Sequence, residues 1–302
     1  MARAWLEGSY KGAGMSEAIA ERVRRYILDG TDRDLRRLLS ISQDAAEMAR
    51  SAFRRVGVQE GWKAIDCGCG PIGGLAVIAE MVGPAGRVVG VDFNEPAVQQ
   101  ARTVAASLGL NNVEVFAGDL NELDPATLGG PFDLAYTRLF LMHQPDPALT
   151  LRRIANLLRP GGLLVAHEPL RSPPPRSHPD VEALASYWEL LHELLERAGV
   201  PQRAVDNLPR YAREAGFEVA ALSGYFMNMR PELGFELHAS TIAAARERAV
   251  RSGVATERQI DDLVRALSAA KRAEHEWVSS PFFLDLTLRK PMTTIERVAA
   301  TR

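Results

Sequence analysis

A short apolar segment that runs into glycines, KAIDCGCGPIGGLAVIAE at residues 63–80, constrains the fold more than any other part of this 302-residue sequence. Gly68, Gly70 and Gly73 follow the spacing G-x-G-x-x-G, which is typical of a strand that turns sharply into a helix beside a nucleotide. Without side chains, these glycines let the backbone turn and approach a ligand closely. Taken alone, the pattern suggests the pyrophosphate loop of an NAD or FAD site.

Strand and helix patterns alternate along the chain after this segment. Apolar runs typical of strands are followed by helical patterns that end at glycine or proline, which indicates a parallel sheet with helices on both faces. The alternating apolar and polar residues near the end of the chain are typical of an edge or hairpin strand. The strands are expected near 63–68, 87–93, 112–120, 131–139, 162–168, 218–226 and 280–290.

The remaining segments predict helices around this sheet. We expect an N-terminal helical lid at 1–58 and a sheet domain at 59–290, with helical insertions at about 172–198 and 230–275. A proline-rich stretch at 171–180 suits a surface crossover, and the tail at 291–302 has no obvious partner element. The insertions follow strand ends, which is where open α/β sheets bind ligands.

Three aspartates are expected at the carboxyl ends of the first three strands: Asp66, Asp92 and Asp119. A carboxylate beside a glycine turn is a poor neighbour for pyrophosphate but a good one for a cation. Asp66 could attract an ammonium group, Asp92 could accept both hydroxyls of a ribose, and Asp119 could accept an adenine amine. S-adenosylmethionine, a phosphate-free nucleoside that carries a sulfonium and an ammonium group, fits this set.

Five motifs in order resemble those of class I S-adenosylmethionine-dependent methyltransferases, most of all the ubiquinone/menaquinone-biosynthesis type and its natural-product relatives. They are AIDCGCGPIGG, VVGVDFNEPAVQQAR, VEVFAGDLNEL, FDLAYTRLFLMHQPDP and LLRPGGLLVAHEP. The resemblance implies a Rossmann-like α/β fold with a seven-stranded, mostly parallel sheet, one antiparallel edge strand and helical lid insertions. It implies S-adenosylmethionine as the cofactor, S-adenosylhomocysteine as the product, and cofactor contacts at Asp66, Gly68, Cys69, Gly70, Asp92, Phe93, Gly118, Asp119, Leu120, Thr137, Arg138 and Tyr26.

Plainer explanations stand beside these assignments. Asp66 could cap nearby backbone N–H groups, and Asp119 could start a turn, since the pair Gly-Asp is common in turns. The first motif departs from the family pattern at Pro71-Ile72-Gly73, where the bulk of Ile72 could narrow the methionine end of the site. Cys67 and Cys69 are the two cysteines of the chain, and we expect both to be small buried residues rather than metal or redox groups.

Methyl transfer needs alignment of donor and acceptor more than acid–base chemistry, so catalytic residues are hard to read from sequence. Glu168 after the fifth strand and His143 after the fourth are the candidates for acceptor contact or a general base. His167 and His238 are further candidates, and Tyr26 is a candidate lid contact as well as a cofactor contact. The expected acceptor pocket is formed by Tyr10, Tyr187, His192 and Phe226.

The sequence therefore predicts an enzyme that methylates a small, fairly apolar metabolite on carbon, oxygen or nitrogen. The net charge of −2 and the lack of a basic stripe argue against nucleic-acid and membrane partners, and a homodimer is conceivable. Few cysteines and the lack of a signal-peptide pattern indicate a cytoplasmic protein. Two alternatives remain: a methyltransferase fold that catalyses a cyclisation or pericyclic step, and an NAD-binding oxidoreductase.

Overall fold

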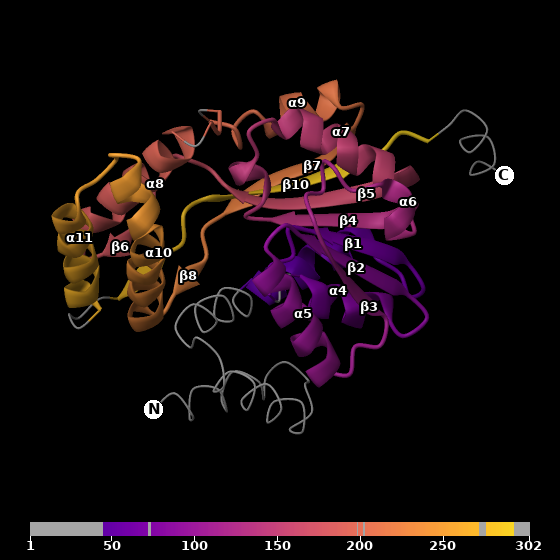
Figure 1. The fold of residues 1–302 in the computed structure, drawn as a ribbon, viewed down its shortest axis with the longest axis horizontal. Coiled ribbons are helices and arrows are strands. Elements are labelled where there is room, and N and C mark those ends of the chain that lie inside the picture. The colour runs from indigo at the N-terminus through magenta and orange to yellow at the C-terminus, as the bar shows by residue number, and fades with distance from the viewer. Residues whose placement is uncertain (1–44, 72–73, 198, 202, 272–275, 293–302) are drawn as a thin grey trace. The chain divides into compact units, whose positions relative to one another are not determined.

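The computed structural model describes residues 45–71, 74–197, 199–201, 203–271 and 276–292. Seven strands form one sheet in the order β3-β2-β1-β4-β5-β10-β7, and helices alternate with these strands along the chain (Figure 1). This sheet confirms the predicted α/β class. The strands are β1 Lys63–Cys67, β2 Arg87–Asp92, β3 Val113–Ala117, β4 Phe132–Arg138, β5 Leu158–Pro169, β7 Glu218–Tyr225 and β10 Phe283–Arg289.

The chain divides into two compact units after Leu123. In the first unit β1, β2 and β3 pair in parallel, with Ile65 of β1 opposite Val89 of β2. The helices α4 (Leu75–Val82) and α5 (Glu95–Ser107) cross over between them. Both Ile65 and Val89 are fully buried. Valine occupies Val88, Val89 and Val91 of β2, as is typical of a strand covered on both faces. A further helix at 45–56 buries Phe53 completely.

The second unit holds the strands β4, β5, β10 and β7 with the helices α6 (Pro125–Leu128), α7 (Pro147–Leu157) and α9 (Leu208–Glu214). The antiparallel strand β10 lies between β5 and β7, one place inside the sheet, whereas the sequence placed it at the edge. Its residues Phe283–Leu288 are buried or half-buried, including the polar side chains of Asp285 and Thr287, because strands pair with β10 on both sides. Strand β7 forms the edge instead, and most of its residues are exposed.

The two predicted helical insertions meet in one cluster that we call the helical subdomain. It consists of α8 (Glu182–Arg197), α10 (Pro231–Arg251) and α11 (Glu257–Ala270), which lie together in Figure 1. A three-stranded sheet closes it, formed by β6 (Ser177–His178), β9 (Trp277–Ser279) and β8 (Asn228–Met229). The sequence missed this sheet, because strands of two or three residues carry no readable periodicity.

A buried hydrogen-bonded chain runs through the helical subdomain. The Nε2 atom of His238 lies 3.1 Å from the carbonyl oxygen of Ser279, and its Nδ1 atom lies 2.7 Å from the hydroxyl of Tyr187. A carbonyl only accepts, so Nε2 carries the proton and Nδ1 accepts from the tyrosine. Tyr187 is 2% exposed, and its hydroxyl group joins α8 to α10 through the bond to His238. Its assignment to the acceptor pocket remains a prediction.

Parts of the expected lid lie outside the described residues. Tyr10, predicted to contact the substrate, and Tyr26, predicted to contact the cofactor, fall in these parts. Residues 293–302 of the predicted tail also lie outside the described residues. Within the ranges that the structure describes, every helix is too short or too polar to cross a bilayer.

Replacing Gly234 with alanine tests the packing of α10 on β9. A Cβ atom at this position would lie 2.2 Å from Cγ1 of Val278, which is fully buried. Helix propensity alone would favour alanine by about 1 kcal/mol. We expect overpacking to win, so that Gly234→Ala lowers the free energy of unfolding by about 1–3 kcal/mol in urea denaturation. As a matched control, Ala244→Gly on the exposed face of α10 should lose about 1 kcal/mol. A Gly234→Ala protein as stable as the wild type would contradict the packing.

The buried imidazole of His238 should make stability depend on pH. Burial lowers the pKa of His238 to about 4, from an ordinary value of 6.5. Between these values the unfolded chain binds a proton that the folded chain does not, so stability is complete above pH 6.5 and falls as the pH drops toward 4. The loss is on the order of 3 kcal/mol. Urea titrations from pH 7.5 to 4 should show a shallower decline for His238→Asn than for the wild type, while His178→Asn, at an exposed position, serves as the control. Equal slopes for wild type and His238→Asn would contradict the assignment.

Candidate functional site

The glycine turn after β1 is held by the buried carboxylate of Asp66. Gly68 and Gly70 adopt φ angles of +74° and +56°, which side-chain-bearing residues rarely adopt. Asp66 is 1% exposed, and its Oδ2 atom accepts the backbone N–H of Gly74 at 2.6 Å. This is the capping role that the sequence left open for Asp66. The carboxylate thus ties the end of β1 to the start of α4, and its assignment as an ammonium contact remains a prediction.

Asp92 joins the same turn to the end of β2. Its Oδ2 atom accepts the N–H of Gly70 at 2.8 Å, and its Oδ1 atom accepts the N–H of Asn94 at 2.9 Å. A carboxylate has about four acceptor positions, so these two bonds leave capacity for a ligand's hydroxyl groups. The side chain is half-buried, and the neighbouring Phe93 is 80% exposed. A Cβ atom on Gly70 would meet nothing within 4 Å, so the space over the turn is open.

Asp119 follows β3 in an exposed turn. Its Oδ1 atom accepts the N–H of Asn121 at 2.8 Å, which is the turn-forming role the sequence allowed. Gly118 before it has a φ of +151°, and the side chain of Leu120 after it is 3% exposed. The side chain of Leu120 is thus buried in the first unit, and the expected cofactor contact of Leu120 remains a prediction. The carboxylate of Asp119 lies at the surface, where the expected contact with an adenine amine stays a prediction.

Cys67 and Cys69 are free thiols buried beside the turn. Burial raises the pKa of both thiols well above the usual range, and the charge of Asp66 adds to the effect. A thiol that stays protonated is a poor nucleophile and a poor metal ligand. Any contact of Cys69 with a cofactor would therefore use its backbone.

The residues of the first unit fit the cofactor expected from the sequence. Three carboxylates stand at successive strand ends, and neither lysine nor arginine occurs in 64–75, 91–97 or 116–121. This negative potential suits a cationic amino acid and opposes a pyrophosphate. The exposed ring of Phe93 offers an apolar surface for a base.

In the second unit, the carboxylate of Glu168 is enclosed by backbone N–H groups. Glu168 is 0% exposed and lies at the end of β5. Its oxygens accept the N–H groups of Phe140, Leu141 and Met142 at 3.0–3.2 Å. Burial raises the pKa of Glu168 to about 7, although these three bonds oppose the rise. This geometry makes Glu168 part of the turn after β4.

The other candidates on β4 and beyond are spread over different environments. Thr137 is fully buried and Arg138 half-buried on β4, and His143 is exposed at the end of η1 (Leu141–His143), a single 3-10 turn rather than the start of a helix. His167 is buried next to Tyr136, whose hydroxyl lies 3.2 Å from its Nδ1 atom, and so is turned into the core. The expected cofactor contacts of Thr137 and Arg138 remain predictions.

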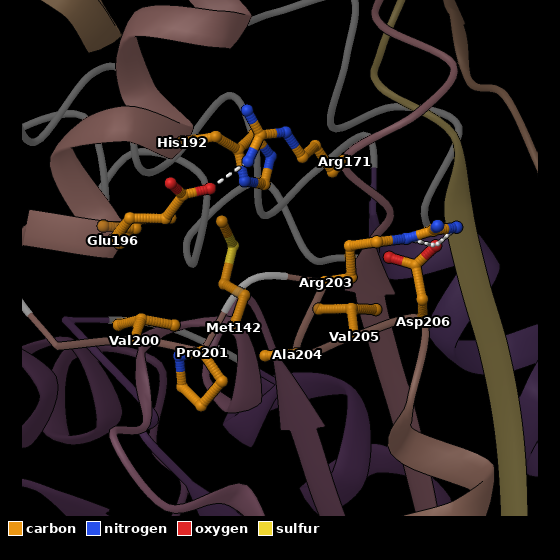
Figure 2. Close-up of a pocket in the computed structure, with 11 residues that line it drawn as sticks. Met142, Arg171, His192, Glu196, Val200, Pro201, Arg203, Ala204, Val205 and Asp206 are labelled. Carbon is orange, nitrogen blue, oxygen red and sulfur yellow. Dashed lines mark hydrogen bonds and ion pairs between the residues drawn. The ribbon is translucent and has the colours of Figure 1, made fainter.

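A small cavity in the second unit lies beside the turn after β4 that carries Met142 (Figure 2). Its volume is about 20 Å³, room for one water molecule. Met142 and His192 reach it, with an ion pair between Arg171 and Glu196 on one side and another between Arg203 and Asp206 at 2.9 Å on the other. Of its lining residues the sequence analysis selected His192 alone. Arg171 lies two residues after the end of β5, and that position was the one available signal for it.

His192 enters this cavity as a neutral ring with an unused nitrogen. Its Nε2 atom is buried and has no hydrogen-bond partner among the described residues, and the same holds for Oδ2 of Asp206. Burial, and then the positive charge of Arg171, lower the pKa of His192 to about 4. Phe226, another expected pocket residue, does not line this cavity: it is 37% exposed and packs edge-to-face on Phe282.

Three curated relatives and one solved structure are similar to this chain. An uncharacterized 37.1 kDa protein in transposon Tn4556 of Streptomyces fradiae is 32% identical over 81% of this chain and 66% of that protein. Nocamycin O-methyltransferase of Saccharothrix syringae is 38% identical over 42% of this chain and 44% of its own. Demethylmenaquinone methyltransferase of Geobacillus stearothermophilus is 32% identical over 39% and 50%. The matches thus span between about half and two thirds of these relatives.

The crystal structure of the 4+2 cyclase SpnF has a TM-score of 0.53 with 20% identity, covering 82% of both chains, which is a likeness of fold. A family model described as a methyltransferase domain matches residues 59–216, more than half of the chain. The matched region contains the glycine turn, Asp92, Asp119 and Glu168, the residues that the site is built on. The chain belongs to the methyltransferase domain family, as its sequence motifs indicated.

Proposed function

We propose that this protein transfers a methyl group from S-adenosylmethionine to a small, fairly apolar metabolite, releasing S-adenosylhomocysteine. The observation that carries the proposal is the carboxylate of Asp92, bonded to the N–H groups of Gly70 and Asn94 beside an open glycine turn. The family membership and the absence of cations at 64–75, 91–97 and 116–121 support it. Relatives named as methyltransferases of nocamycin and demethylmenaquinone favour a small-molecule acceptor over a macromolecule.

The cofactor would be held by the first unit. Asp92 would accept the ribose hydroxyls, Phe93 would lie against the adenine, and Asp119 with the backbone of Leu120 would contact the adenine edge. Asp66 supports the turn on which these contacts depend. When bound, S-adenosylmethionine supplies an electrophilic methyl group on its sulfonium. The protein's own residues would bind the cofactor, orient it toward the acceptor and exclude water. Gly68, Cys69, Gly118, Thr137 and Arg138 complete the proposed set.

The acceptor would be contacted by residues of the second unit. Met142 provides an apolar surface, and His192 provides an unused nitrogen in a cavity that now has room for one water. A nitrogen with a pKa near 4 is a weak base at neutral pH, so His192 is suited to accept a hydrogen bond rather than to remove a proton. Desolvation and the positive charge of Arg248 lower the pKa of His143, on the adjoining turn, to about 4, so His143 is likewise suited to accept a hydrogen bond from the acceptor rather than to remove a proton. Positioning can supply roughly 7–11 kcal/mol of the barrier reduction in such a transfer.

A cyclisation or pericyclic step on the same fold is the second hypothesis. The structural neighbour SpnF is titled a 4+2 cyclase, so a fold of this kind carries such chemistry in that protein. The two hypotheses differ in one product. Release of S-adenosylhomocysteine together with acceptor conversion supports methyl transfer, whereas conversion without that release supports cyclisation.

Binding measurements test the cofactor assignment directly. We expect isothermal titration calorimetry to detect S-adenosylmethionine and S-adenosylhomocysteine but not NADH, because carboxylates oppose a pyrophosphate. Replacing Asp92 with alanine removes hydrogen-bond acceptors for the ribose and should weaken binding by about 1–3 kcal/mol, roughly 5- to 150-fold. Asp180→Ala, on an exposed segment of the second unit, is the matched control and should bind as the wild type does.

Two outcomes would contradict the proposal. Tight NADH binding without any binding of S-adenosylmethionine would show that the cofactor is a dinucleotide. Unchanged affinity in Asp92→Ala, with the variant shown to be folded by circular dichroism, would remove Asp92 from the site.

A further inference from the structure

The carboxylate of Glu168 makes more hydrogen bonds to backbone than any side chain described above. Phe140 donates its N–H to both oxygens, at 3.2 and 3.1 Å. Leu141 donates to Oε1 at 3.0 Å, and Met142 donates to Oε2 at 3.2 Å. Consecutive N–H groups that converge on one anion form a nest, which here is filled by the protein's own carboxylate.

The register of the sheet explains why Glu168 meets this turn. On the parallel pair of β4 and β5, Arg138 is level with His167, so Glu168 is level with the first residue after β4. That residue, Leu139, has a φ of +54°, a conformation that leucine rarely adopts. The chain turns there and points the next three N–H groups back at β5. A conformation of this kind persists only where its surroundings hold it.

These contacts are hard to reconcile with the role of a general base. A base must reach the proton that it removes, and Glu168 has no exposed surface. Both of its oxygens are already engaged by N–H groups. The turn that they hold carries Met142, which lines the cavity with His192, and then His143. Glu168 therefore acts on the cavity through the backbone.

We propose that Glu168 is a positioning residue, whose carboxylate fixes the turn Leu139–His143 and thereby places Met142 against the acceptor and presents His143. The statement that the acceptor lies against Met142 rests on the proposed function. The statement that the Glu168 carboxylate fixes the turn does not, so the two statements are tested separately.

Nuclear magnetic resonance of the amides and of the Met142 methyl group tests the positioning. Glu168→Gln keeps the size of the side chain but presents an NH₂ donor to N–H groups, so it cannot accept all three bonds. We expect the amide signals of Phe140, Leu141 and Met142 and the Met142 methyl signal to move together, while signals of the first unit stay in place. Glu168→Asp, one methylene shorter, should not restore them. Glu232→Gln, at an exposed position on α10, should change none of these signals.

A pH titration of the wild type supplies a second readout. Burial first, and then the bonds from the turn and the side chain of Thr137, set the pKa of Glu168 near 7. The three turn amides should therefore titrate together with a midpoint near pH 7, and this titration should be lost in Glu168→Gln. Other titratable groups nearby are His143 on the turn itself, and His167 on β5, whose Nε2 atom lies 3.6 Å from Asp285 on β10. Any titration that these histidines cause would survive in Glu168→Gln.

Each result decides one question. If the turn amides and the Met142 methyl are unmoved in Glu168→Gln and do not titrate in the wild type, the positioning role is overturned. A Glu168→Gln protein that fails to fold leaves the wild-type titration and Glu168→Asp to decide. Calorimetry with S-adenosylmethionine on the wild type and Glu168→Gln should give equal affinities. Absence of binding to the wild type would overturn the proposed function and leave the positioning result standing.

Discussion

Buried or half-buried carboxylates that accept backbone N–H groups organise the turns at the strand ends of this protein. A chain that leaves a strand and bends at once exposes N–H groups that no neighbouring strand can pair, and burying them unpaired is costly. Asp66 pairs with Gly74, Asp92 with Gly70 and Asn94, and Glu168 with the three residues from Phe140 to Met142. The loops of the site owe their shape to these bonds.

The same carboxylates give the first unit its chemical preference. A turn held by Asp66 and Asp92 brings negative charge to the place where a dinucleotide would put its phosphates. The glycine spacing that suggests NAD is therefore used here in a setting that favours a cationic nucleoside. The carboxylate of Asp92 can accept further hydrogen bonds, and the ring of Phe93 is exposed, so both can contact a ligand.

Acid–base chemistry is less prominent than positioning in the second unit. The histidine that reaches the cavity, His192, has a pKa lowered to about 4, and the buried Glu168 is enclosed by its own turn. Neither group is well placed to remove a proton at neutral pH. This agrees with a displacement reaction in which alignment of the reactants contributes more than a base. The helical subdomain, with the Tyr187–His238–Ser279 chain in its core, is held by packing of its own.

Sequence by itself determined the alternation of strands and helices, the glycine turn and the positions of Asp66, Asp92 and Asp119 at strand ends, because these follow from local periodicity and chain conformation. It also indicated Glu168 and His192 as candidate site residues. Tertiary structure alone decided what each side chain does. Glu168 meets N–H groups 26–28 residues away only because β4 and β5 pair in one register. Tyr187 meets His238, 51 residues further along the chain, only because the two insertions pack together. Such contacts depend on long-range packing, which leaves no pattern in the sequence near either residue.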